Sequence, residues 1–506
     1  MTSAPLARGT ARALLTSRAA LIALALLVAA TATDHLSLSA GGLNLRTELL
    51  VGGLVAVWAV ARSRGAALRT LGIIEVCVLG WLGANVAASL VFAPDKKESL
   101  KFAVIIAGLV ILYIGARLLL GSEEAVVWAA SAWVAAGAGV GLIALACALL
   151  YTFFGIDAGL TLDRAYQDGI FTVTPKVQGT MWEPNILGSY SLTVAALGFA
   201  LSMAPAFATP LRQCALMFAV ACAYCGMMLS MTRTVWAIGG ALLVGLWALG
   251  AWLRLADSRL LIRRWALPGA IGIALGLVVG NFFMPTLSWK SATPWNLTYG
   301  QVEQGVQSII TGHGPPADVP DGPTPVPTPV GVAAASIATP VPVSKSSTFV
   351  GKVQDAASFN ESVSVTSRER IYSQAFEGWR RSPVLGWGAG AFPQLYPPPF
   401  DHSYWIANLE LHTLFDTGIV GLAFLSTAGA LAAWRGVRLL RGPPAAWDTT
   451  RFVVFGLEVS FVGLLIAYQV TEGSWLGFTW LLFAMLVASE GVARPVRSQP
   501  AGAADA

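Results

Sequence analysis

Apolar stretches long enough to cross the roughly 30 Å hydrocarbon layer of a membrane, about 20 residues each, recur along most of this chain of 506 residues. Hydrophobic residues make up 56% of the sequence and charged residues only 12%, which excludes a soluble globular protein. The pattern predicts an all-α membrane protein with about twelve transmembrane helices. The predicted spans are 14–33, 47–62, 71–93, 101–120, 125–153, 186–204, 212–231, 234–255, 266–285, 409–434, 452–470 and 474–490.

The arginines of the short loops set the expected orientation. If the N-terminus is cytoplasmic, the arginine-rich loops around 62–69, 254–264 and 435–451 all lie inside, as the positive-inside rule requires. The first apolar segment also has the features of a signal peptide. We favour an uncleaved first span, and cleavage would leave the later topology unchanged.

This orientation divides the chain into membrane and extracytoplasmic parts. Residues 1–154 hold spans 1–5, 155–185 form a first outer loop, 186–285 hold spans 6–9, 286–408 form a large outer loop, 409–490 hold spans 10–12, and 491–506 are a cytoplasmic tail. Residues 314–347 of the large loop are rich in proline and low in complexity, which predicts an extended spacer. All five cysteines fall in apolar segments, so we expect buried thiols rather than disulfides.

Arginines near the outer membrane surface are the first candidate site residues, because charges at a membrane are costly. Arg233 stands between two threonines in "MTRTVW", where spans 7 and 8 meet. The alternative is a simple interfacial anchor. In the large loop, "RERIYSQAFEGWRRSPVLGWGAGAF" carries Arg368, Arg370, Arg380 and Arg381. These four belong either to the solvated face of a helix or to a site for an anionic substrate.

Two polar clusters stand at predicted helix starts. In "WEPNILGSY", Glu183 and Asn185 precede span 6, where Asn185 either caps the helix or joins Glu183 in binding a sugar hydroxyl. In "LELHTLFDTG", His412 and Asp416 are four residues apart and share a helix face, so the carboxylate can orient the imidazole. A structural histidine is the alternative there. Glu410 lies on a different face of the same helix.

These segments together resemble the O-antigen ligase and O-antigen polymerase family of bacterial polytopic membrane glycosyltransferases. The resemblance spans about residues 180–425 and rests on "MTRTVW", on "WEPNILGSY", on an Arg followed by an aromatic residue and Pro-x-x-Gly-x-Gly-x-Gly, and on "LFDTGIVGLAFL". It implies a GT-C-like enzyme that takes a glycan from a polyprenyl (undecaprenyl) diphosphate, without a metal, at the extracytoplasmic face of the plasma (inner) membrane. The acceptor would be a glycan or a lipid. We expect no other cofactor and no nucleic-acid partner.

The resemblance also assigns residues. Arg233 and Arg370 match the family's two functional arginines, whereas the family's His-Asn pair reads Ala407-Asn408 here. His412, His402 and Glu410 are therefore the alternatives for a general base. We predict Arg233, Arg370, His412 and Glu410 as catalytic residues, and Arg368, Glu183, Asn185 and Asp416 as substrate-binding residues.

The chemistry of the expected reaction explains why arginines would be needed at the site. Cleavage of a sugar–diphosphate bond leaves negative charge on the diphosphate, which fixed guanidinium groups stabilise through bidentate hydrogen bonds. We expect Arg370 and Arg368 to face the diphosphate, and Arg380 and Arg381 to lie on the outer surface. A polytopic transporter or flippase of lipid-linked glycans is the competing class. Transporters often have paired halves with interrupted helices, and the sequence has no such symmetry.

Overall fold

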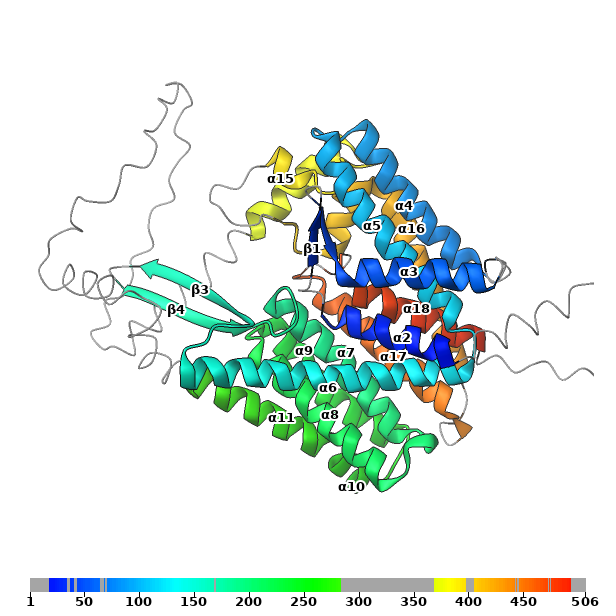
Figure 1. Ribbon diagram of the computed structural model, residues 1–506, viewed down its shortest axis with the longest axis vertical. Coiled ribbons are helices and arrows are strands. Elements are labelled where there is room, and N and C mark those ends of the chain that lie inside the picture. Colours follow the sequence, from blue (N-terminus) through cyan, green and yellow to red (C-terminus); the bar gives the residue numbers. More distant parts are fainter. Residues whose placement is uncertain are drawn as a thin grey trace, which may run out of the picture.

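Helices lying side by side make up most of the protein, as the computed structural model in Figure 1 shows. The structure describes residues 18–33, 37–40, 43–63, 68, 71–167, 170–283, 368–396, 405–441, 443, 446–471, 473 and 475–492. The Pro-rich tract 314–347, His402 and the predicted tail beyond residue 492 lie outside the described residues.

In the described part of the chain, a helix overlaps each of the twelve predicted apolar segments. These helices are α2 (Arg18–Thr31), α3 (Thr47–Arg62), α4 (Ile73–Val91), α5 (Lys96–Leu119), α6 (Glu123–Phe154), α7 (Pro184–Met203), α8 (Pro210–Leu229), α9 (Arg233–Trp252), the continuous run α10 (Ser258–Leu261), η3 (Ile262–Ala266), α11 (Leu267–Leu277) and η4 (Val278–Phe283), then α16 (Leu409–Leu439), α17 (Thr449–Ala467) and α18 (Gly477–Val492). Within the described residues, nine helices are long and apolar enough to cross a membrane, and α2 and most of α18 are shorter apolar helices. The chain is therefore a multi-pass, all-α membrane protein.

Local sequence signals explain where several helices begin and end. The side chains of Asp95, Ser122, Asn408 and Asp448 each accept a backbone N–H at the start of α5, α6, α16 and α17. Each bond satisfies a donor that the first turn of a helix leaves free. α6 ends at Gly155, whose φ of 68° lies in the left-handed region.

Two antiparallel hairpins extend from the helices. β1 (Ser37–Ala40) pairs with β2 (Leu43–Arg46) between α2 and α3, and β3 (Leu160–Gln167) pairs with β4 (Ile170–Val177) between α6 and α7. The β3–β4 hairpin occupies most of the predicted first outer loop, and it projects past the ends of the helices (Figure 1).

Contacts between distant connections mark the two ends of the bundle. At the end that carries the hairpins, the Thr180 hydroxyl donates to the Ala32 carbonyl at 2.7 Å. At the opposite end, the Thr450 hydroxyl donates to the Glu123 carboxylate at 2.5 Å. Both pairings follow from helices that alternate in direction along the chain, and the same alternation brings residues 368–396 and 405–408 to the hairpin end.

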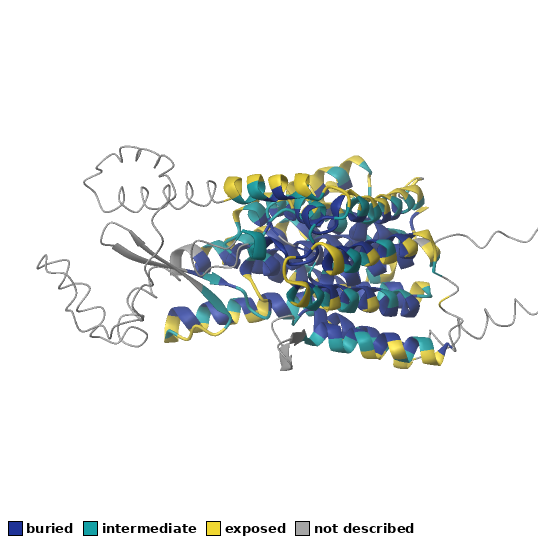
Figure 2. Ribbon diagram, turned by 90° about the horizontal axis from the view of Figure 1, so that it is seen from above, coloured by how far each residue is buried: buried dark blue, intermediate teal, exposed yellow. Residues whose placement is uncertain are grey.

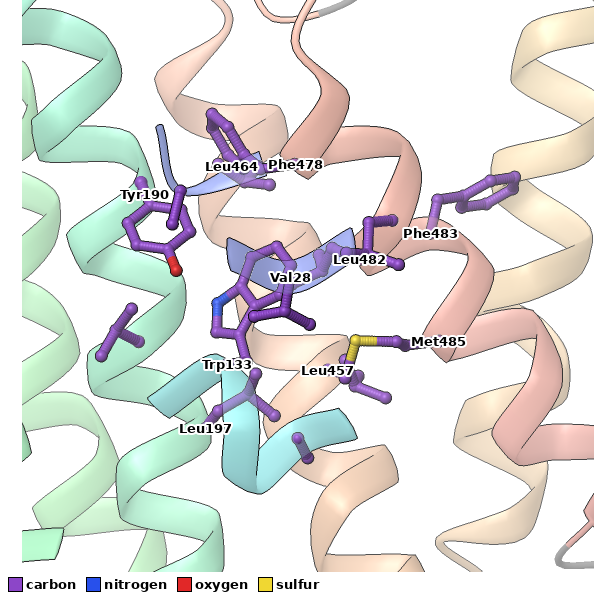
Figure 3. Packing of buried hydrophobic residues seen from close by; sticks show 14 of the residues in the cluster. Val28, Trp133, Tyr190, Leu197, Leu457, Leu464, Phe478, Leu482, Phe483 and Met485 are labelled. Carbon is purple, nitrogen blue, oxygen red and sulfur yellow. The ribbon is translucent and has the colours of Figure 1, made fainter. Parts of the chain in front are cut away.

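The centre of the bundle is a packed aromatic core. Trp133 of α6 lies with its ring centroid 5.2 Å from that of Tyr190 on α7, and Tyr190 lies 5.5 Å from Phe478 of α18 (Figure 3). The Trp133 indole donates to Thr193 at 3.0 Å, so its polar atom is satisfied inside the core. Exposed residues, many of them large and apolar, lie on the outward faces of the helices (Figure 2), as expected for a surface in contact with lipid.

Embedded polar groups pair helices. Glu75 of α4 lies with its Oε1 3.4 Å from Arg117 Nε of α5, and its other oxygen accepts from the Gly72 N–H at 2.6 Å. Glu75 therefore connects α4 to α5. Glu458 is buried on α17 against Gly436 of α16, where the absence of a side chain leaves room for the carboxyl.

The cysteines differ from the prediction at one position. All five are free thiols, and four of them are buried. Cys214 is exposed because it lies on an outward face of α8. The expectation of buried thiols is therefore wrong for Cys214.

Candidate functional site

A tight loop follows the helix at 368–381 and rests on three glycines. Gly386, Gly388 and Gly390 have φ values of 69°, 91° and 70°, in the left-handed region that favours glycine. A Cβ on Gly388 would lie 2.6 Å from the Cα of Ser89 on α4. The Pro-x-x-Gly-x-Gly-x-Gly pattern therefore encodes a backbone shape that fits closely against the bundle.

This glycine loop, residues 382–391, meets α16 where that helix is interrupted. Gly418 has a φ of 62° and a ψ of −165° inside α16. The Trp387 N–H donates to the Phe415 carbonyl at 2.9 Å. The Gly388 N–H donates to the Asp416 carbonyl at 2.8 Å. The loop thus satisfies backbone groups that the interruption frees, which is the condition for non-helical backbone within a membrane protein.

Two serines anchor the other side of the glycine loop. The Ser99 hydroxyl of α5 donates to the Ala389 carbonyl at 2.6 Å, and the Ala389 N–H donates to the Ser89 hydroxyl at 3.2 Å. The two hydroxyls also contact each other at 3.1 Å. Sequence reasoning missed both serines. The sequence did contain one signal for them. Ser89 lies near the end of α4 and Ser99 near the start of α5, so two consecutive apolar helices each carry a hydroxyl close to the turn that joins them.

His412 and Asp416 form a buried pair beneath the loop. His412 Nε2 lies 3.1 Å from Asp416 Oδ2, and each side chain is only 5% exposed. The Trp475 ring centroid lies 5.6 Å from that of His412. A small cavity beside the pair has room for about one water-sized molecule. Its lining residues are Trp81, Asn85, Ile106, His412, Thr413, Asp416, Thr417 and Trp475.

Glu410 has a very different environment from that of His412. Its side chain is exposed, and both carboxylate oxygens accept from the Gln469 amide nitrogen at 2.9 Å. Asn408 caps α16, and its amide also donates to Gln469. Gln469 is a candidate site residue that the sequence analysis did not identify, because it belongs to no motif.

The helix at 368–381 is attached to the same region through Tyr372. The Tyr372 hydroxyl donates to the Ala407 carbonyl at 2.8 Å. Burial raises the pKa of Tyr372, and the nearby positive charge of Arg368 partly offsets that rise. Arg368 therefore lies close to the start of α16, beside the segment that carries Glu410.

The four arginines of this helix do not differ in exposure, although two of them were expected to face a substrate and two to lie on the outer surface. Arg368, Arg370, Arg380 and Arg381 are all exposed, and Arg381 pairs with Glu377 one turn earlier. Arg380 and Arg381 lie on the surface as expected. Arg370, expected to face the diphosphate, is equally open to the surface.

The second pair of motifs meets at the start of α7 and of α9. The Thr232 hydroxyl donates to Asn185 Oδ1 at 2.9 Å, and Arg233 is the first residue of α9 with an exposed side chain. Asn185 is the second residue of α7, so it does not occupy the N-cap position. Glu183 occupies the N-cap position without a side-chain capping bond. The Glu183 side chain reaches the surface, yet the protein around it raises its pKa by desolvation.

The predicted residues thus form two groups. Glu183, Asn185 and Arg233 gather at the α7–α9 junction, while Arg368, Glu410, His412 and Asp416 gather around the start of α16. In the part of the chain that the structure describes, no three His, Cys, Asp or Glu side chains are grouped as a metal site would require. Neither the protein-family models nor the curated proteins compared with this chain match it.

Proposed function

We propose that this protein is a twelve-span, GT-C-like glycosyltransferase of the bacterial plasma membrane. It would transfer a glycan from a polyprenyl-diphosphate-linked donor to a glycan or lipid acceptor on the extracytoplasmic side, as an O-antigen ligase or polymerase does. The observation that carries the proposal is that motifs far apart in the sequence contact each other in two pairs: "WEPNILGSY" with "MTRTVW", and the glycine loop with "LFDTG". Asn185 bonds to Thr232 across 47 residues of sequence, and the glycine loop bonds to the interruption of α16.

The arginines supply the electrostatic part of the proposed mechanism. The acceptor oxygen forms a bond to the anomeric carbon as the sugar–phosphate bond breaks, and the electron pair of that bond leaves with the diphosphate. Arg233 and Arg370 would stabilise this charge, with Arg368 as a further contact. Because a guanidinium group donates two parallel hydrogen bonds, it matches a phosphate better than an ammonium group does.

The base is the second part. The acceptor hydroxyl must lose a proton, and a positioned base contributes about 10²- to 10⁴-fold to such a step. We propose Glu410 for this role, because its carboxylate is exposed while His412 is buried against Asp416. His412 and Asp416 would then support the interruption of α16 rather than touch the acceptor.

Release of the diphosphate tests the proposal directly. The purified full-length protein in lipid nanodiscs is given undecaprenyl-diphosphate-linked glycan and acceptor, and free undecaprenyl diphosphate is measured. We expect release by the wild type, near loss in Arg233→Ala, and little change in the matched surface variant Arg380→Ala. A glycan on a chemically distinct acceptor would identify a ligase, whereas a longer lipid-linked glycan would identify a polymerase. An inactive wild type with every donor and acceptor pair would contradict the proposal.

A transporter or flippase is the second candidate, and the interruption of α16 is the observation that favours it. Transporters bind substrates and ions at interrupted helices, and the buried His412–Asp416 pair lies beside Gly418. Gly418 is, however, the tenth residue of the 31-residue α16, which places the interruption in the first third of the helix rather than at its middle. Movement of a labelled lipid-linked glycan across proteoliposomes without diphosphate release would favour this candidate.

A further inference from the structure

Gln469 is the strongest unassigned feature near the proposed base. It follows the end of α17 and donates from its amide nitrogen to both carboxylate oxygens of Glu410, at 2.9 Å each. The same nitrogen donates to the Leu465 carbonyl at 3.1 Å. A side chain just after α17 therefore fixes a carboxylate of α16 that would otherwise be a mobile surface group.

The Gln469 amide is itself held in one orientation. Its Oε1 accepts from the Asn408 side-chain nitrogen at 3.2 Å, while Asn408 Oδ1 accepts from the Leu411 N–H at 2.9 Å. Because Asn408 uses its oxygen to cap α16, its nitrogen faces Gln469, and this forces the Gln469 nitrogen toward Glu410. The order of donors and acceptors thus leaves a single consistent arrangement.

We propose that Gln469 is a positioning residue that presents Glu410 to the acceptor hydroxyl, an inference that rests on the proposed function. A neutral amide holds the carboxylate in place and leaves its negative charge intact. A lysine or arginine partner would instead neutralise that charge. An ionised carboxylate has about four lone-pair sites, so two bonds from Gln469 leave capacity for the substrate proton. The Tyr372 hydroxyl also contacts the Gln469 carbonyl, at 3.4 Å, which connects the helix at 368–381 to this arrangement.

Gln469→Glu is the sharpest test, because it keeps the acceptor for Asn408 and changes only the group that faces Glu410. Two adjacent carboxylates disfavour each other's ionised form, so the pair takes up a proton more readily than a lone carboxylate does. A base works when deprotonated, so the low-pH limb of turnover should move to higher pH. The other titratable or charged groups on the elements next to Glu410 are Arg368 and Tyr372 on the helix at 368–381, and His412 and Asp416 on α16.

A second measurement does not depend on turnover. Carbodiimides modify protonated carboxyl groups, and mass spectrometry reads the labelling of Glu410 against pH in the purified full-length protein. We expect labelling in Gln469→Glu to persist to higher pH than in the wild type. An unmoved labelling curve would overturn the positioning role even if the wild type is an active transferase. If the labelling curve moves but the wild type releases no diphosphate, the contact between Gln469 and Glu410 is supported and the proposed function is contradicted.

Gln469→Met separates position from charge, since it keeps the length of the side chain and removes the amide. Loss of hydrogen bonds to a charged group should lower turnover about tenfold to a hundredfold, without the pH shift of Gln469→Glu. The matched control is Glu377→Gln, an exposed carboxylate paired with Arg381 on the helix at 368–381, for which we expect unchanged turnover. Equal turnover in Gln469→Met and Glu377→Gln would contradict the inference.

Discussion

His412 Nε2 and Asp416 Oδ2 lie 3.1 Å apart, and Asp416 stands two residues before the interruption of α16 at Gly418. The backbone carbonyl of Asp416 is also the acceptor for the Gly388 N–H of the glycine loop. Asp416 therefore connects the buried pair with the loop, so the pair and the loop should depend on each other for stability.

This dependence predicts the behaviour of His412→Ala. Removal of the imidazole leaves Asp416 buried without its partner, and an unsatisfied buried polar group costs about 1–3 kcal/mol. The free energy of unfolding in detergent should fall by that amount. Asp416→Asn should have a similar effect, and the double variant should lose less than the sum of the two. Additive losses would indicate that the two side chains act independently.

The same variant also tests the assignment of the base. If Glu410 accepts the proton, Glu410→Gln should abolish diphosphate release while leaving the stability of the protein unchanged, because the Glu410 side chain is exposed. His412→Ala should retain turnover at a temperature where it is folded. A shifted pH profile in His412→Ala, together with an active Glu410→Gln, would return the role of base to His412.

Sequence reasoning found the parts of this site that local patterns encode. The membrane helices follow from segment length, because lipid offers no partner for free backbone groups, and the His412–Asp416 contact follows from helix spacing. Gln469 and Ser99 escaped it, because their partners Glu410 and Ala389 lie 59 and 290 residues away in the chain. Periodicity describes one helix at a time, whereas these contacts arise only when helices pack.

Gly388 should tolerate no side chain. Its φ of 91° is unfavourable for alanine, and the added Cβ would lie 2.6 Å from Ser89 Cα. Gly388→Ala should therefore lower the free energy of unfolding by more than about 1 kcal/mol. Gly83, on an exposed face of α4, has no atom within 4 Å of a built Cβ, so Gly83→Ala is the control and should be neutral or stabilising. Equal effects of the two would refute the close contact.

Glu183 should make stability depend on pH. Its pKa is raised above the ordinary value by desolvation, so folding favours the protonated form. Its stabilising contribution is then fully present below the ordinary pKa of 4.5 and is lost as pH rises through the folded-state value. Glu183→Gln should be more stable than the wild type at neutral pH and equal to it at low pH. Unfolding curves at several pH values measure the difference, and a constant offset would contradict the raised pKa.

Arg233 and Arg370 should tolerate neither alanine nor lysine if they hold the diphosphate. Both side chains are exposed, so neither substitution should alter folding or membrane insertion. Loss of one transition-state donor lowers turnover about 10²- to 10³-fold, so both Arg→Ala variants should be nearly inactive. Lysine keeps the charge but loses the planar pair of donors, so Arg233→Lys and Arg370→Lys should also be strongly impaired. Arg380→Lys, on the same helix as Arg370, is the matched control and should retain full turnover. Wild-type turnover in both Arg→Lys variants would show that charge alone suffices, and wild-type turnover in both Arg→Ala variants would remove these residues from the site.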